Sequence, residues 1–186
     1  MKNNMNKIRK FFNLSRYVRD EKGMSFTETA ILFPVLLSMM MAVYDLGQGV
    51  IVNQKTVAAS QVIADLVTRN EVVNVDLITD IVNAGELALA PYEVNESFGY
   101  DIASVEFDEN DEPVVLWRIT ENMAQDDDAI DSTSGLGVQG EGVVVVNVTY
   151  EYDPYFSNFI VDTISMNERA FLRGRKSMTV PCSDCP

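Results

Sequence analysis

Apolar residues form an unbroken stretch near the start of the chain. No charged residue occurs from Thr29 to Tyr44, and the apolar run begins at Met24. At about 1.5 Å of rise per residue, roughly 20 helical residues cross the hydrocarbon core of a bilayer. The run predicts a transmembrane helix over 24–52, kinked at Pro34, which membrane helices tolerate. Because no small-x-small cleavage site follows promptly, we expect a retained helix rather than a secretory signal peptide.

A helical pattern continues beyond this stretch. Apolar or small residues recur at intervals of three and four and predict that the helix extends to about Asn70. A second helix is expected from about Val75 to Ala90, ending before Pro91. The stripe on the first helix consists of Val52, Thr56, Ala59, Ile63 and Leu66.

The period then changes from helix to strand. Alternation over 100–107 and a second run over 114–120 predict a β-hairpin around the polar cluster between them. Residues 121–142 are rich in Asp, Ser and Gly and are interpreted as a long loop. The remaining expected elements are a strand over 143–152, a short helix over 156–164 and a last strand within 168–180.

Together these elements predict an α+β fold. A long N-terminal transmembrane helix continues into a soluble domain with a second helix and an antiparallel sheet of about four strands. We expect three parts: a leader over 1–23, the membrane helix over 24–52 and the exported domain over 53–186.

The distribution of charge indicates the orientation. Residues 1–23 contain seven basic and two acidic residues, whereas the rest of the chain contains seven basic and 26 acidic residues. A basic flank is retained on the cytoplasmic side of a membrane, so the acidic part is expected to be exported. An acidic domain also argues against a nucleic-acid partner, because phosphates require Lys and Arg surfaces.

One short motif lies between the leader and the apolar run. Gly23 is followed by Met24-Ser-Phe-Thr-Glu28, which places a carboxylate at the start of a membrane helix. At full depth such a group costs about 2.5–3.5 kcal/mol on insertion scales, so Glu28 requires an explanation. Glu28 can reside in the headgroup layer as a helix N-terminal acid, or it can pair with an amine.

The motif resembles the cleavage site of type IV prepilins. Together with Pro34 and with Tyr44-Asp45-Leu46-Gly47 at the membrane exit, it is similar to the TadE/TadF-like minor pseudopilins of the tight-adherence (Tad) pilus system. The segment Val144–Pro154 resembles that family's strand and Tyr-x-Tyr-x-Pro turn, while Thr29 replaces the family's usual aromatic or apolar residue.

The resemblance implies a function and a set of partners. A prepilin peptidase would cut after Gly23, and Glu28 would meet the new α-amine of Met24 in a neighbouring subunit. From the residues alone, Glu28 can also pair with the amine of its own chain. The protein would be a single-pass inner-membrane subunit with a periplasmic domain, needed for pilus assembly and surface adherence. Its partners would be the peptidase, other pilin or pseudopilin subunits, the Tad machinery and inner-membrane lipid. The alternative is an uncleaved single-pass anchor with a partner-binding periplasmic domain.

Few residues suggest catalysis or metal binding. The chain contains no histidine, and we find no nucleophile elbow and no phosphate-cradling glycine loop, so we expect neither an enzyme nor a cofactor. Cys182 and Cys185 have the spacing of a redox motif but lie at the C-terminus. They can form a disulfide with each other, bond to a partner or supply half of a metal site, and the internal disulfide is preferred.

The acidic loops and the aromatic residues complete the candidates. The clusters at 108–112 and 126–131 are interpreted as solvated surface rather than calcium loops, because they lack alternating ligand spacing. Basic residues Arg169, Arg173 and Arg175 are expected to be ordinary surface charge. Six aromatic residues on or beside the strands are expected in the core: Phe107, Trp117, Tyr150, Tyr152, Tyr155 and Phe156.

Overall fold

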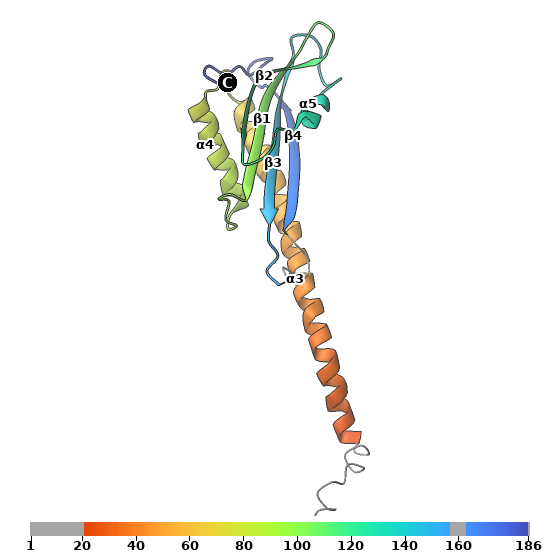
Figure 1. Ribbon diagram of the computed structural model, residues 1–186. Coiled ribbons are helices and arrows are strands. Elements are labelled where there is room, and N and C mark those ends of the chain that lie inside the picture. The colour runs from red at the N-terminus through yellow and green to blue at the C-terminus, as the bar shows by residue number, and fades with distance from the viewer. Residues whose placement is uncertain (1–20, 157–162, 186) are drawn as a thin grey trace, which may run out of the picture. The chain divides into compact units, whose positions relative to one another are not determined.

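The computed structural model describes residues 21–156 and 163–185 (Figure 1). The chain divides into two compact units between Tyr44 and Asp45. This division falls before the boundary expected after residue 52, because the side chains of Asp45 and Val52 are already buried in the second unit. The predicted leader lies outside the described residues up to position 20.

Helix α3 covers Glu21–Thr68 and contains Pro34. Its predicted apolar stripe is confirmed, since Val52, Thr56, Ala59 and Ile63 are fully buried. The threonine in this stripe donates its hydroxyl to the carbonyl of Val52, so it carries no unsatisfied polar group into the core.

The second predicted helix is present as α4, Val75–Glu86, continued by the 3₁₀ turn η1, Leu87–Leu89. The side chain of Asn74 caps α4 by accepting a 2.8 Å hydrogen bond from the backbone N–H of Leu77. The helical stretch therefore ends before Pro91, as its sequence predicts, although the α-helical part is shorter than expected.

Four antiparallel strands form one sheet in the order β2-β1-β3-β4. The predicted hairpin is confirmed as β1 and β2, and a register shift between Ser104 and Val105 leaves Leu116 without a partner in the ladder. The strand bounds are β1, Phe98–Phe107; β2, Pro113–Glu121; β3, Gly142–Tyr152; and β4, Ile164–Arg173.

Helices lie on both faces of this sheet within the Asp45–Pro186 unit (Figure 1). The larger core joins α4 and the buried side of α3 to residues such as Phe98, Ile102 and Trp117. A smaller cluster on the opposite face packs Ala129 and Ile130 against the other side of β1 and β3. This second cover explains why most residues of β3 are buried on both faces.

Three expectations require correction. The segment expected to be a long loop contains the short helix α5, Asp127–Asp131, capped by the side chain of Asp126. The last strand begins before residue 168, because its pairing with β3 extends to Ile164. Tyr155 and Phe156 are exposed rather than buried in the core, since the chain has left the sheet after Tyr152. The expected helix over 156–164 falls largely on residues 157–162, outside the described part.

Candidate functional site

The first candidate is the apolar part of α3. Large apolar side chains from Phe26 to Val43 are exposed on every side of the helix, among them Ile31 at 71% and Met40 at 69%. Full exposure of a side chain of this size forgoes about 1.5–3 kcal/mol of burial free energy, so an apolar environment would stabilise the segment. It is the one helix in the described residues that is long and apolar enough to cross a membrane.

Glu28 lies on this segment with its side chain exposed. No ion pair involves Glu28 within the described residues. The backbone of Gly23 and Met24 belongs to the first turns of the same helix. Since residues four apart share a helix face, Glu28 lies one turn from the position at which cleavage would create an amine. Thr29, which departs from the pattern of the family that the motif resembles, donates its hydroxyl to the carbonyl of Ser25 at 2.8 Å and is compatible with lipid.

Asp45 marks the point where α3 enters the second unit. Its side chain is only 5% exposed, and Oδ2 accepts a 3.0 Å hydrogen bond from the backbone N–H of Phe156. One turn further, Gly49 lies beside the ring of Tyr152. Gly47 is exposed, and nothing lies within 4 Å of the position a Cβ would occupy. Of the two predicted exit residues, Asp45 therefore makes a tertiary contact, and Gly47 has room for a larger side chain.

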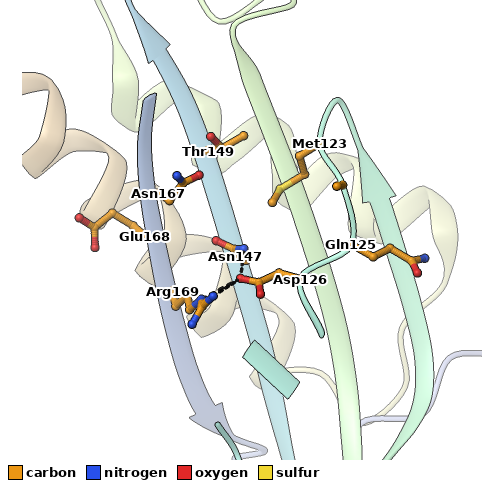
Figure 2. Close-up of a pocket in the computed structure, with 9 residues that line it drawn as sticks. Met123, Gln125, Asp126, Asn147, Thr149, Asn167, Glu168 and Arg169 are labelled. Carbon is orange, nitrogen blue, oxygen red and sulfur yellow. Dashed lines mark hydrogen bonds and ion pairs between the residues drawn. The ribbon is translucent and has the colours of Figure 1, made fainter. Parts of the chain in front are cut away.

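A network of charges covers the sheet face opposite α3 (Figure 2). Asp126 receives a hydrogen bond from the amide of Asn147 at 2.7 Å and forms an ion pair with Arg169 at 2.6 Å. Asp127 forms an ion pair with Arg118 at 2.6 Å. Both aspartates are paired with arginines. The side chain of Asp127 is nevertheless 84% exposed, as expected for a solvated loop, whereas that of Asp126 is only 16% exposed, so the expectation is wrong for Asp126. Carboxylates held in this way are not arranged as calcium ligands.

Asp101 is the buried centre of this network, and its role could not be recognised from the sequence. Its carboxylate forms a bidentate contact with Arg118 at 2.8 and 2.6 Å and accepts hydrogen bonds from Thr120 and from the backbone N–H of Asp126. Burial raises the pKa of Asp101, but these donors outweigh it and hold the pKa below its ordinary value. Asp101 in turn raises the pKa of Arg118, so both groups remain charged.

The arginines expected to be ordinary surface charge do lie at the surface, and each forms an ion pair there. Arg173 pairs with Glu141 at 3.2 Å, and Arg175 pairs with Asp65 on α3. Between the charge network and strands β3 and β4 lies an open groove of about 770 Å³. Asp126 and Arg169, which line this groove, already form an ion pair with each other. The groove is therefore better explained as a surface stabilised by that pair than as an active site. Its lining includes Met123, Gln125, Asp126, Asn147, Thr149, Asn167 and Arg169 (Figure 2).

Cys182 and Cys185 form a disulfide in the structure. The segment around them is tied to the fold rather than frayed. Ser183 donates its backbone N–H to the carbonyl of Val73, and Asp184 accepts a hydrogen bond from the N–H of Val75 at the start of α4. With both sulfurs in a disulfide, the thiolates that a zinc site requires are absent, so the arrangement serves as a clip for α4.

Comparisons with known proteins provide no further assignment. No protein-family model, no curated protein and no solved structure matches this chain. The residues and contacts described above are therefore the basis for a functional conclusion.

Proposed function

We propose that this chain is a minor pseudopilin-like structural subunit of a Tad-type pilus, inserted in the inner membrane and processed by a prepilin peptidase after Gly23. The observation that carries the proposal is the position of Glu28. It is a carboxylate one turn after Met24, at the start of an otherwise uncharged and exposed helical segment. A residue of this kind within an apolar helix is a functional candidate by default.

Cleavage would give Glu28 a partner. Hydrolysis of the bond after Gly23 frees the α-amine of Met24, which is about 6 Å along the axis from Glu28 at 1.5 Å per residue. An ammonium group at that distance, in the same subunit or in a neighbour, offsets the cost of carrying the carboxylate into an apolar filament core. The resemblance to the TadE/TadF-like family implies the pairing between subunits.

The contrast between the two parts of α3 supports a structural role. The apolar side chains before Asp45 are exposed on all sides, whereas the stripe from Val52 to Ile63 is covered by the sheet. The first part is thus available to lipid or to the helices of other subunits, and the second part serves as the core of a periplasmic head domain. Other pilin or pseudopilin subunits and the Tad machinery are the partners this arrangement suits.

One observation favours an alternative. Gly23 lies inside α3, which begins in the described residues at Glu21, so the bond to be cut is helical. A protease requires extended backbone, and the first turn must unwind before cleavage. Glycine within a helix costs about 1 kcal/mol relative to alanine, which makes that unwinding easier. An uncleaved membrane anchor with a partner-binding domain would leave the turn intact.

The deciding experiment is N-terminal sequencing and intact-mass measurement of the protein from its host. We expect a mature chain that begins at Met24, and we expect Gly23→Leu to abolish processing. Gly47→Leu is the matched control, because it introduces the same side chain into the same helix at an exposed position. An intact N-terminus in peptidase-competent cells would establish the anchor instead.

A second variant separates processing from assembly. Glu28→Leu removes the carboxylate without changing Gly23, so the chain should still be cut and inserted. If Glu28 pairs with the amine of a neighbour, pili should be lost in this variant and partly restored by Glu28→Asp. Normal piliation with Glu28→Leu would show that the carboxylate does not act in assembly.

A further inference from the structure

An exposed apolar patch lies at the end of the second unit where α3 enters it. We name it the basal patch and define it by Leu46, Val50, Ile51, Tyr155 and Phe156. Leu46 is 70% exposed and Val50 59%, and since they are four residues apart they share one face of the helix. Tyr155, 65% exposed, comes from the turn that follows β3.

The end of β3 and one hydrogen bond place this turn beside the helix. The ring of Tyr152 lies 3.9 Å from the position a Cβ would occupy on Gly49. One helical turn earlier, the carboxylate of Asp45 accepts the hydrogen bond from the N–H of Phe156. The end of β3 and the turn after it therefore run along α3, and the exposed aromatic pair belongs to the same end of the unit as Leu46.

Chain continuity indicates what covers the basal patch. The uncharged run of α3 ends at Tyr44, and Asp45 follows without a linker. At about 1.5 Å per residue, Leu46 lies about 3 Å and Ile51 about 10 Å further along the helix axis. The interfacial layer outside the hydrocarbon core is about 5–8 Å deep on each side, so residues 45–51 are placed within or beside it.

The chemistry of the patch suits that layer. Tyrosine combines an apolar ring with a polar hydroxyl and is enriched at membrane interfaces. The charged residues in the neighbouring loops, Asp153 and Glu93, are exposed and acidic. Lys55, the nearby cation on α3, donates to the carbonyls of Ala88 and Ala90. The contact is therefore based on insertion of apolar side chains and not on attraction to anionic headgroups.

From these observations we propose that the basal patch inserts into the headgroup layer of the membrane. Tyr155 and Phe156 then bind the exported domain to the bilayer surface, in addition to its covalent attachment through α3. The inference rests on the membrane insertion of α3 in the proposed function, and it is independent of cleavage after Gly23. It identifies a lipid surface as a direct partner of the exported domain. Asp45 then has a second role, because it fixes the turn that reaches the lipid.

Photo-cross-linking of the full chain tests this inference. The photoreactive residue p-benzoylphenylalanine replaces Tyr155, and the protein is reconstituted in phosphatidylcholine vesicles and irradiated. The matched control carries the same photoreactive residue in place of Leu136, which is also an exposed apolar residue. The carbonyl of Leu136 accepts a hydrogen bond from Arg173, the last residue of β4, whereas Ile164 is the first residue of that strand. We expect a phospholipid adduct, seen by mass spectrometry, that is severalfold more abundant at position 155 than at position 136.

The possible results are distinct. Covalent dimers at position 155 without a lipid adduct would show that a second copy covers the patch, and this would overturn the inference. Equal or absent lipid adducts at the two positions would also overturn it. Flotation with the vesicles is measured on the same samples, and failure to float would refute the membrane insertion in the proposed function as well. N-terminal sequencing in the host reports on processing separately.

Discussion

The backbone N–H of Phe156 donates a 3.0 Å hydrogen bond to Oδ2 of Asp45, which is 111 positions earlier in the chain. This bond attaches the turn after β3 to the first residue of α3 in the Asp45–Pro186 unit. It assigns a tertiary contact to an acid that the sequence marks only as a residue near the membrane exit.

Replacement of Asp45 should release this turn. Asp45→Ala removes the acceptor, and since hydrogen bonds to charged groups contribute about 1.5–3 kcal/mol, we expect hydrogen exchange at the Phe156 amide to accelerate about tenfold or more. Asp45→Asn retains an oxygen acceptor and should show a smaller effect. Unchanged exchange in Asp45→Ala would show that the turn is held by other contacts.

The pair of Asp101 and Arg118 should make stability dependent on pH. Because the folded state lowers the pKa of Asp101, its stabilising contribution is present above the ordinary aspartate pKa of about 3.9 and is lost as the pH falls through the folded value. The difference in free energy of unfolding between the wild type and Asp101→Asn should therefore shrink below about pH 4. Urea titration of the full chain in detergent, monitored by Trp117 fluorescence, measures it.

The same pair allows a comparison at neutral pH. Loss of one member of a buried pair leaves the other charge without compensation, so Asp101→Ala should reduce the free energy of unfolding by about 3–5 kcal/mol. Asp131→Asn, at an exposed position on α5, is the control and should change it by less than about 0.5 kcal/mol. Equal effects of the two substitutions would contradict a central role for Asp101.

Close packing between α3 and α4 depends on Gly85. A Cβ at this position would lie 2.4 Å from Cγ1 of Ile63, so Gly85→Ala should destabilise the fold by about 1–3 kcal/mol despite the higher helix propensity of alanine. Gly47→Ala has open space around its Cβ and should be neutral or slightly stabilising. In a double-mutant cycle, Ile63→Ala should relieve part of the penalty of Gly85→Ala; strict additivity would exclude the clash.

Reduction of the Cys182–Cys185 disulfide should weaken the start of α4. The two cysteines are three positions apart, and closure of so short a loop contributes about 2 kcal/mol in the chain-entropy treatment. We expect faster hydrogen exchange at Val75 and Leu77 after reduction, with little change in β1 and β3. A double Cys→Ser variant should match the reduced protein. Exchange that rises equally throughout the domain would argue against a local clip.

Local patterns in the sequence were sufficient for most of the elements. The uncharged run is identified by its length, the stripe from Val52 to Ile63 by burial at the helical period, and β3 by a continuous apolar segment that is buried on both faces. Neighbouring residues alone reveal each of these features. The short helix α5 was missed because Asp, Ser and Gly dominate its surroundings. Its formation depends on the Asp126 cap and on packing of Ala129 and Ile130 against the far face of the sheet.

The candidate functional residues also divide into those that local sequence indicates and those that only the tertiary structure reveals. Gly23, Glu28 and Pro34 stay predictions from the sequence, and they can be made there because the role of each depends on its position within a single segment. In the sequence, Asp101 is distinguished only as a polar position in an alternating strand. Its burial follows from the pairing of β1 with β2, which places Arg118 and Thr120 on the same face, and from the crossing of the loop at Asp126.

By itself, therefore, the sequence determined an apolar helix long enough to cross a membrane, its acidic start and an α+β domain beyond it. Only the tertiary structure decided which charges are buried, which arginines neutralise the acidic loop, and which turn lies against Asp45. The physical reason is that the periodicity of a sequence reports only whether each position faces an apolar or a polar environment on average. A specific partner is set by strand register and by loop paths between residues far apart in the chain.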